Sequence, residues 1–290
     1  MSNIAEIDKN LEIKSDVDVS DLVFFDVREE PFSVYGLYDY KNQPEFKRMP
    51  DEVARPIDRG VGILARHTSG GRVRFATNSK TVAIKAYMPD FCRMNHMPFS
   101  GSGGFDMFVE EPKLRIYRHA KTFVPPENIE NGYVARFSFR SEKMRYITIN
   151  FPLYNTLSKL EIGLDKGAEL SAGLDYKSDK PIVYYGSSIT QGGCASRPGN
   201  SYQNIISRRL ELDFINLGFS GNARAQDAMV DYIRSLDMCA LVCDYDHNAP
   251  TSEHLEKTYR RMYERFREVH PDTPYIMVSR VDIEIGRAHV

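Results

Sequence analysis

Pro-Ile-Val-Tyr-Tyr-Gly-Ser-Ser-Ile-Thr-Gln-Gly-Gly, residues 181–193, is the stretch that decides the fold. A short run of β-branched and aromatic residues ends at Gly186, and two serines and then a glycine pair follow. This order predicts a buried strand, a tight turn and a helix soon after it. Side chains just past the carboxyl end of such a strand stand at the open edge of an α/β sheet, where ligands bind. Ser188 is therefore placed as a nucleophile would be, although a polar turn without function would have the same composition.

The chain after Pro181 continues with apolar strands that alternate with helices. We predict strands at residues 182–186, 214–220, 239–245 and 274–279, and helices at residues 201–212, 225–236 and 252–270. Apolar strands that alternate with helices predict a parallel sheet with both faces covered. We therefore expect a three-layer α/β domain of flavodoxin-like type over residues 181–283.

The chain before this domain is organised differently. From residue 22 to about residue 164, polar and apolar residues alternate in short runs separated by turn residues, as in Arg-Val-Arg-Phe-Ala-Thr at 72–77. Such runs predict a β-sandwich of jelly-roll type. We expect a loose lead-in over residues 1–20, a β-sandwich domain over residues 21–165 and a polar linker over residues 166–180.

Composition excludes several classes of function. The 290 residues are 42% hydrophobic and 27% charged, with a net charge of −2, which is typical of a soluble globular protein. No broad basic field favours nucleic acid, and no apolar run approaches the ~20 residues of a membrane span. The N-terminus lacks the pattern of a secretory signal, so we expect a cytoplasmic protein. The four cysteines form no Cys-x-x-Cys pair, and we expect neither a disulfide framework nor a metal site.

Three predicted strands end in polar segments that can converge at one edge of the sheet. These segments cover residues 186–192, 216–222 and 244–250. Acyl transfer needs a hydroxyl nucleophile and donors directed at the developing oxyanion. Ser188 supplies the hydroxyl, and its own N–H, the Gly221 N–H and the Asn248 side-chain amide are candidate donors.

This ordered set resembles the SGNH/GDSL hydrolase superfamily. The matching motifs are Gly-x-Ser-x-Thr-x-Gly at 186–192, Ser-Gly-Asn at 220–222 and the asparagine at 248. The chain is most similar to two-domain bacterial carbohydrate-esterase-like members with an N-terminal β-sandwich. The resemblance implies that Ser188 is the nucleophile, that Gly221 and Asn248 form the oxyanion hole, and that no cofactor is used. Ser187 stands where this family commonly has aspartate.

Three further residues in or just after these segments are candidates for contact with substrate. They are Gln191, Arg224 and His247. His247 also completes an Asp-x-x-His pattern with Asp244, but this pattern follows the third strand, where the resemblance places the asparagine block. We therefore interpret the spacing as coincidence.

The resemblance places the catalytic Asp-x-x-His after a fifth strand, which this sequence does not show. Its last residues, Glu-Ile-Gly-Arg-Ala-His-Val at 284–290, look like the translation of a sequencing adapter. We therefore expect a truncated hydrolase domain, a non-native tail in which His289 is not catalytic, and little activity in this chain.

The sequence leads to a serine esterase that removes acetyl or other short acyl groups from carbohydrate. The expected partner is an acylated oligosaccharide or another small ester. We expect no binding to nucleic acid or membrane. Two alternatives stay open: a non-catalytic carbohydrate-binding module, and a hydrolase of lipids or thioesters from the same superfamily.

Overall fold

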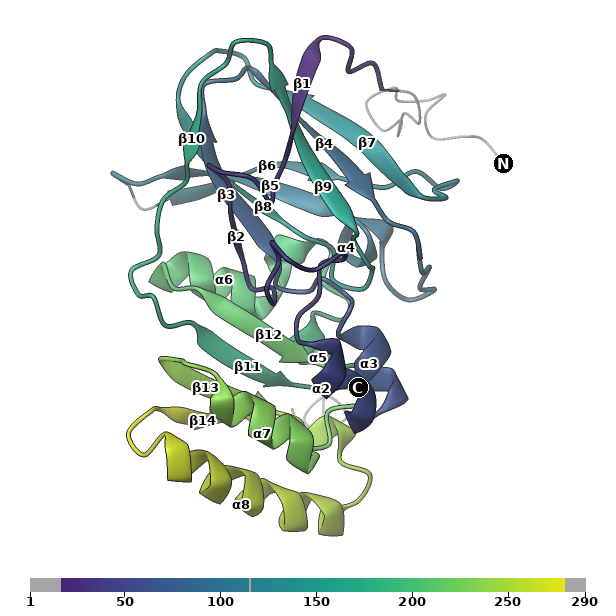
Figure 1. Ribbon diagram of the computed structural model, residues 1–290, viewed down its shortest axis with the longest axis vertical. Helices are drawn as coiled ribbons and strands as arrows, with labels where there is room; N and C mark the ends of the chain where they lie inside the picture. Colours follow the sequence, from purple (N-terminus) through teal and green to yellow (C-terminus); the bar gives the residue numbers. More distant parts are fainter. Residues whose placement is uncertain (1–16, 115, 280–290) are drawn as a thin grey trace, which may run out of the picture.

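The computed structural model describes residues 17–114 and 116–279 and shows an antiparallel β-sandwich stacked on a parallel α/β unit (Figure 1). The predicted tail at 284–290 and most of the predicted lead-in lie outside these residues. No helix in the described part of the chain combines the length and the apolar character needed to cross a bilayer.

The β-sandwich consists of two antiparallel sheets, as predicted. The first has the strand order β1 (Leu22–Asp26), β9 (Lys159–Asp165), β4 (Thr81–Tyr87) and β7 (Gly132–Ser138). The second has the order β10 (Leu170–Ala172), β3 (Arg72–Thr77), β8 (Arg145–Asn150), β5 (Phe105–Glu111) and β6 (Ile116–Phe123), with β2 (Ser33–Tyr35) paired to β3. Alternate side chains such as Val73, Phe75, Ile84 and Ile162 fill the space between the sheets.

Strand β3 is buried along its whole length, which a strand with one solvated face would not be. Val73 and Phe75 point into the sandwich core, so the alternate residues Arg72 and Arg74 lie on the opposite face. That face packs against the α/β unit, because Arg72 forms an ion pair with Asp213. The contact between the two units therefore includes an ion pair.

The parallel sheet has the strand order β12 (Phe214–Gly218), β11 (Ile182–Gly186), β13 (Ala240–Asp244) and β14 (Tyr275–Met277). Helix α6 (Tyr202–Leu210) covers the face that carries Ile182 and Tyr184. Helices α7 (Asp227–Ser235) and α8 (Ser252–Val269) cover the face that carries Val183 and Tyr185. This arrangement confirms the predicted three-layer fold class.

Two helices belong to a different layer than the sequence suggests. Helices α2 (Asp51–Ile57) and α3 (Arg59–Leu64) precede β3, yet they lie beside the parallel sheet (Figure 1). Ala54 and Val61 share a hydrophobic core with α7 and α8 rather than with the sandwich. Their helices are short, and Pro56 and two glycines weaken the helical pattern, so periodicity gives little indication of them.

The predicted linker also contains regular structure. Strand β10 lies within residues 166–180 and pairs antiparallel with β3. Three residues are too few for a periodic pattern to be recognised. The strand forms because β3 supplies its backbone hydrogen-bond partners.

Candidate active site

The register of the parallel sheet brings three strand ends to one level. Gly186 at the end of β11 pairs with Gly218 at the end of β12 and with Asp244 at the end of β13. The segments that follow these residues therefore leave the same edge of the sheet. These are the segments that carry the predicted nucleophile and the predicted oxyanion donors.

Ser188 is the first residue of the short helix α5 (Ser188–Gln191) and is partly exposed. Its hydroxyl has no hydrogen-bond partner among residues 17–114 and 116–279. The preceding Ser187 is fully buried, and its hydroxyl accepts a hydrogen bond from the Ile189 N–H at 3.2 Å. Ser187 therefore caps the helix, which aspartate also does well, so the departure from Gly-Asp-Ser leaves this contact intact.

Gly221 presents an open backbone. Its φ is +71°, a conformation that favours glycine, and a Cβ at this position would meet no atom within 4 Å. Within the described part of the chain, its N–H has no acceptor. A substrate oxygen can therefore reach this N–H without a side chain in the way.

Asn248 ends the short 3₁₀ turn η3 (Asp246–Asn248) after β13. Its side-chain oxygen accepts a hydrogen bond from the Ala223 N–H at 3.3 Å, which links this turn to the segment after Gly221. Because the oxygen is engaged, the amide NH₂ remains as the donor group. The geometry is thus compatible with the donor role that the resemblance implies.

Gln191 does not stand where a substrate would meet it. Its side chain is fully buried, its oxygen accepts the Ser220 N–H at 2.9 Å, and its NH₂ group lies 3.3 Å from His67 Nδ1. The expectation of substrate contact is therefore not supported for this residue. Gln191 instead ties the nucleophile helix to the segment before Gly221.

Arg224 is partly exposed and donates a hydrogen bond from Nη2 to the Gly221 carbonyl at 3.2 Å. It therefore lies next to the predicted oxyanion hole, and its contact with substrate stays a prediction.

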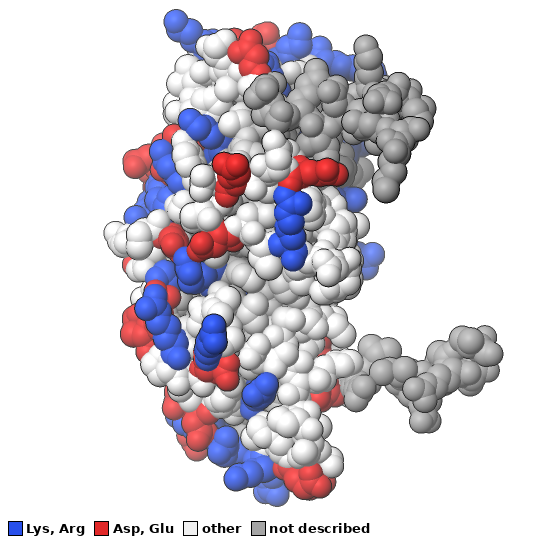
Figure 2. Space-filling model, turned by 90° about the vertical axis from the view of Figure 1, so that its right-hand side faces the viewer, with Lys and Arg blue, Asp and Glu red and all other residues white. Residues whose placement is uncertain are grey.

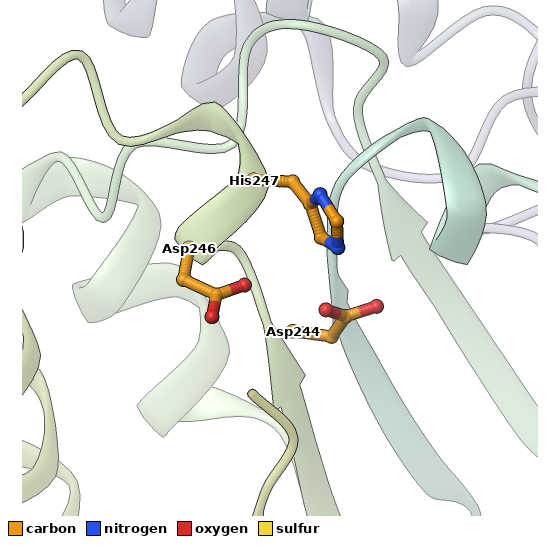
Figure 3. Close-up of side chains that lie close together, drawn as sticks. All are labelled: Asp244, Asp246 and His247. Carbon is orange, nitrogen blue, oxygen red and sulfur yellow. The ribbon is translucent and has the colours of Figure 1, made fainter. Parts of the chain in front are cut away.

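His247 lies beside two carboxylates, as Figure 3 shows. Potential ligand atoms of Asp244, Asp246 and His247 are all within 4.8 Å of one another, so these three side chains could together bind a cation. Burial raises the pKa of Asp244, while a hydrogen bond from Thr190 and the charge of His247 oppose this shift. The Asp244 carboxylate also braces α5 through Thr190, which gives the cluster a structural role.

The β-sandwich part of the chain supplies residues directly behind α5. The Tyr154 hydroxyl donates to the Ser188 carbonyl at 3.3 Å, and the Ser69 hydroxyl donates to the Gln191 carbonyl at 2.5 Å. Gly60 of α3 lies so close to the Asn222 side chain that a Cβ there would clash. Sequence reasoning missed these residues because single polar residues far from the motif carry no pattern.

His67 also lies behind α5 and is neutral at physiological pH. Burial, reinforced by the charges of Arg48 and Arg66, lowers the pKa of His67 to about 3.

Arg48 itself is buried and donates to four backbone carbonyls, including those of Asn216 and Gly218 at 2.9 and 2.6 Å. Arg48 thereby fixes the end of β12 from the side of the sandwich.

Comparisons with known proteins agree with this architecture. The model of the GDSL-like Lipase/Acylhydrolase family matches residues 179–288, and the model described as "N-terminus of Esterase_SGNH_hydro-type" matches residues 22–170. No curated protein sequence matches this chain.

Solved structures share the two-part fold. A protein from Bacteroides ovatus described as a GDSL-like lipase is 25% identical with a TM-score of 0.79, over 88% of this chain and 73% of its own. The salicylyl-acyltransferase SsfX3 from a tetracycline biosynthetic pathway is 20% identical with a TM-score of 0.67, over 89% of this chain and 72% of its own. A family two carbohydrate esterase from Cellvibrio japonicus is 10% identical with a TM-score of 0.55, over 92% of this chain and 83% of its own.

The two family models follow one another along the chain and correspond to the sandwich and to the α/β unit. The motif segments meet at the edge of the parallel sheet where this type of fold binds ligands. The chain belongs to the SGNH/GDSL hydrolases with an N-terminal sandwich, and it is a carboxylic ester hydrolase.

Proposed function

We propose that this protein removes acetyl or other short acyl groups from carbohydrate, with Ser188 as the nucleophile. One observation carries the proposal: the register that aligns Gly186, Gly218 and Asp244 and so gathers three motif segments at one edge. The carbohydrate substrate is supported by the fold shared with family two carbohydrate esterases, which is an argument from likeness of fold.

In this mechanism the Ser188 hydroxyl attacks the ester carbonyl, and its proton passes to a general base. The carbonyl oxygen becomes an oxyanion held by the N–H groups of Ser188 and Gly221 and by the Asn248 amide. The sugar hydroxyl leaves with a proton, and water then releases the acid from the acyl-enzyme.

The general base is a histidine in SGNH hydrolases by resemblance. Among the described residues, the one Asp-x-x-His pattern is Asp244 to His247, which follows β13, where the asparagine block belongs. We therefore assign the general base to none of residues 17–114 and 116–279. Acetate release is expected to depend on Ser188.

The test measures acetate release from acetylated xylo-oligosaccharides by the full chain and by Ser188→Ala. Loss of the nucleophile is expected to abolish the enzymatic part of the rate, as triad mutations in subtilisin lower kcat by roughly a millionfold. Ser235→Ala, which removes an exposed hydroxyl at the end of α7, is the matched control. Equal acetate release by Ser188→Ala and the wild type would refute the proposal.

The length of the acyl group separates the carbohydrate esterase from a lipid hydrolase. We expect p-nitrophenyl acetate to be cleaved faster than p-nitrophenyl decanoate. A preference for decanoate would favour the lipid or thioester alternative.

A glycan-binding role for the sandwich has one specific observation in its favour. An open hollow on the sheet that contains β4 and β7 is lined by Tyr87, Asn128 and Asn131, which combine an aromatic ring with amide groups. Calorimetry of the full-length Ser188→Ala variant with xylo- and manno-oligosaccharides tests this role. Binding that is lost in Tyr87→Ala would support it, and absence of heat with every glycan would exclude it at the concentrations used.

A further inference from the structure

A small cavity lies between the sandwich and helix α6, away from the strand-end segments of the candidate active site. Arg72 and Arg74 line it from β3, Tyr176 from the connecting segment, and Asn204, Ser207 and Arg208 from α6. The room inside suffices for about one particle of the size of a water molecule. Both structural units therefore contribute side chains to one small space.

Arg74 carries unpartnered donors in this space. The residue is 3% exposed, and its Nη2 pairs with a Glu110 oxygen at 2.5 Å. The centre of the Tyr176 ring lies 4.3 Å from the guanidinium carbon. This contact covers the face of the guanidinium and provides no acceptor for the N–H groups at its edge. Among the described residues, Nε and Nη1 have no hydrogen-bond acceptor although both are buried. A buried charged donor without an acceptor is costly, so an acceptor is expected here.

Arg208 approaches the same cavity from the opposite unit. Its Nη2 donates to the Gly199 carbonyl at 2.7 Å, and the Phe108 ring lies 4.3 Å from its guanidinium carbon. Its Nη1 is buried and finds no acceptor in the described part of the chain. Two arginines from different units thus present free N–H groups at one place.

The lining of the cavity contains three arginines, Arg72, Arg74 and Arg208, and one carboxylate, Glu110. Arg72 pairs with Asp213 and Arg74 pairs with Glu110. Arg208 has no carboxylate at ion-pair distance among residues 17–114 and 116–279. Both oxygens of Glu110 are already engaged, by Arg74 and by the Thr148 hydroxyl. Arg208 therefore brings to the lining a positive charge without an ion-pair partner, and this charge attracts a small anion.

We propose that the cavity binds one small monovalent inorganic anion, of the size of chloride, between Arg74 and Arg208. The available space excludes phosphate and sulfate, which are several times larger than a water molecule. A neighbouring hollow shares Arg74 and Glu110 and is also lined by three further carboxylates: Glu111, Asp175 and Glu211. Their repulsion grows with the charge of a ligand, which also favours a monovalent anion.

The bound anion joins β3 to α6 and so stabilises the contact between the two units. This inference does not depend on the proposed function, because the cavity contains none of the residues assigned to catalysis. A ligand that binds the folded state raises the thermal stability in proportion to the logarithm of its concentration above Kd.

The first experiment measures the Tm of the full chain while chloride replaces gluconate at constant ionic strength. We expect a saturable rise of a few degrees in the wild type and no rise in Arg208→Met. Arg260→Met, which alters a side chain that is 84% exposed on α8, should retain the full rise. No rise in the wild type, or an equal rise in Arg208→Met, would overturn the proposal.

The second experiment applies even where Arg208→Met does not fold. Wild-type crystals grown in bromide should show an anomalous peak in the cavity, within hydrogen-bond distance of the Arg74 and Arg208 nitrogens. Density without an anomalous signal at this position would assign the space to water and refute the anion site.

Discussion

Gly221 combines two requirements at one backbone position, a positive φ and an unobstructed N–H. We expect Gly221→Ala to lower kcat by about 10- to 100-fold, because a methyl group lies in the path of the substrate oxygen. The backbone strain should cost about 1 kcal/mol of the free energy of unfolding. Ester hydrolysis and urea unfolding measure the two effects.

Gly167 provides a matched control for this substitution. Its φ is +85°, and a Cβ there also meets no atom within 4 Å, but it follows β9 in the sandwich. Gly167→Ala should show the same loss of stability with unchanged kcat. Equal loss of kcat in both variants would show that strain, and not obstruction of the oxyanion hole, explains the effect.

His67 should make the protein sensitive to acid. Its pKa is about 3 in the folded state and about 6.5 when unfolded, so the unfolded chain binds more protons between these values. The stability from this residue is complete above pH 6.5 and is lost as pH falls toward 3, by at most about 1.4 kcal/mol per pH unit. Urea unfolding of the wild type and of His67→Gln from pH 7 to pH 4 should show a shallower decline in the variant. Parallel declines would mean that His67 is protonated without cost.

The candidate site could be predicted only where residues form an ordered motif. Ser188, Gly221 and Asn248 are each close to the end of a strand, and strand ends can be located from apolar runs. His67, Ser69 and Tyr154 contact the nucleophile helix α5 from the sandwich side. Each lies more than 30 positions from the motif along the chain, so only tertiary structure brings it there. Gln191 belongs to the predicted motif segment and is expected to face substrate, whereas its side chain is buried and contacts Ser220 and His67.

At the scale of elements, Arg48 connects the α2–α3 segment to the end of β12. Arg48→Met should lower the free energy of unfolding by about 3 kcal/mol or more, because it leaves buried carbonyls of Asn216 and Gly218 without donors. The midpoint of urea unfolding measures this change. Arg55→Met, on the exposed side of α2, is the control and should stay within about 0.5 kcal/mol of the wild type. A similarly small effect of Arg48→Met would mean that water replaces the guanidinium.

The long elements follow from their sequence periodicity, and the short ones do not. Helix α8 has apolar residues at helical spacing over 18 residues, and its predicted range agrees with the structure within one residue. Helices α2 and α3 are 7 and 6 residues long, so their helical state depends on Met49, Ala54 and Val61 entering the core of the parallel sheet. Strand β10 likewise depends on its pairing with β3.

At the scale of the whole molecule, the described parallel sheet has an exposed edge. Ile276 and Met277 in β14 are 49% and 52% exposed, and unpaired edge strands promote association between molecules. Met277→Lys should reduce light scattering at 37 °C, with an unchanged far-ultraviolet circular dichroism spectrum. Leu210→Lys, at the end of α6, removes an equally exposed apolar side chain away from the edge and should have little effect. Equal improvement in both variants would indicate general solubility rather than the edge.

One face of the molecule carries surface charges of both signs. Figure 2 shows Lys and Arg interspersed with Asp and Glu on this face, beside a broad uncharged area. Buried arginines instead join the two units: Arg72 pairs with Asp213, and Arg48 donates to the carbonyls of Asn216 and Gly218. Net charge alone could not predict these contacts.

The position of α2 and α3 has a consequence for synthesis on the ribosome. Val61 and Met229 share one hydrophobic core although they are 168 positions apart. At roughly 5–20 residues per second, the α2–α3 segment emerges about 10–30 s before α7 is made. During that interval its apolar side chains have no permanent partner, so nascent chains of this protein should bind chaperones over this segment until the second unit has been translated.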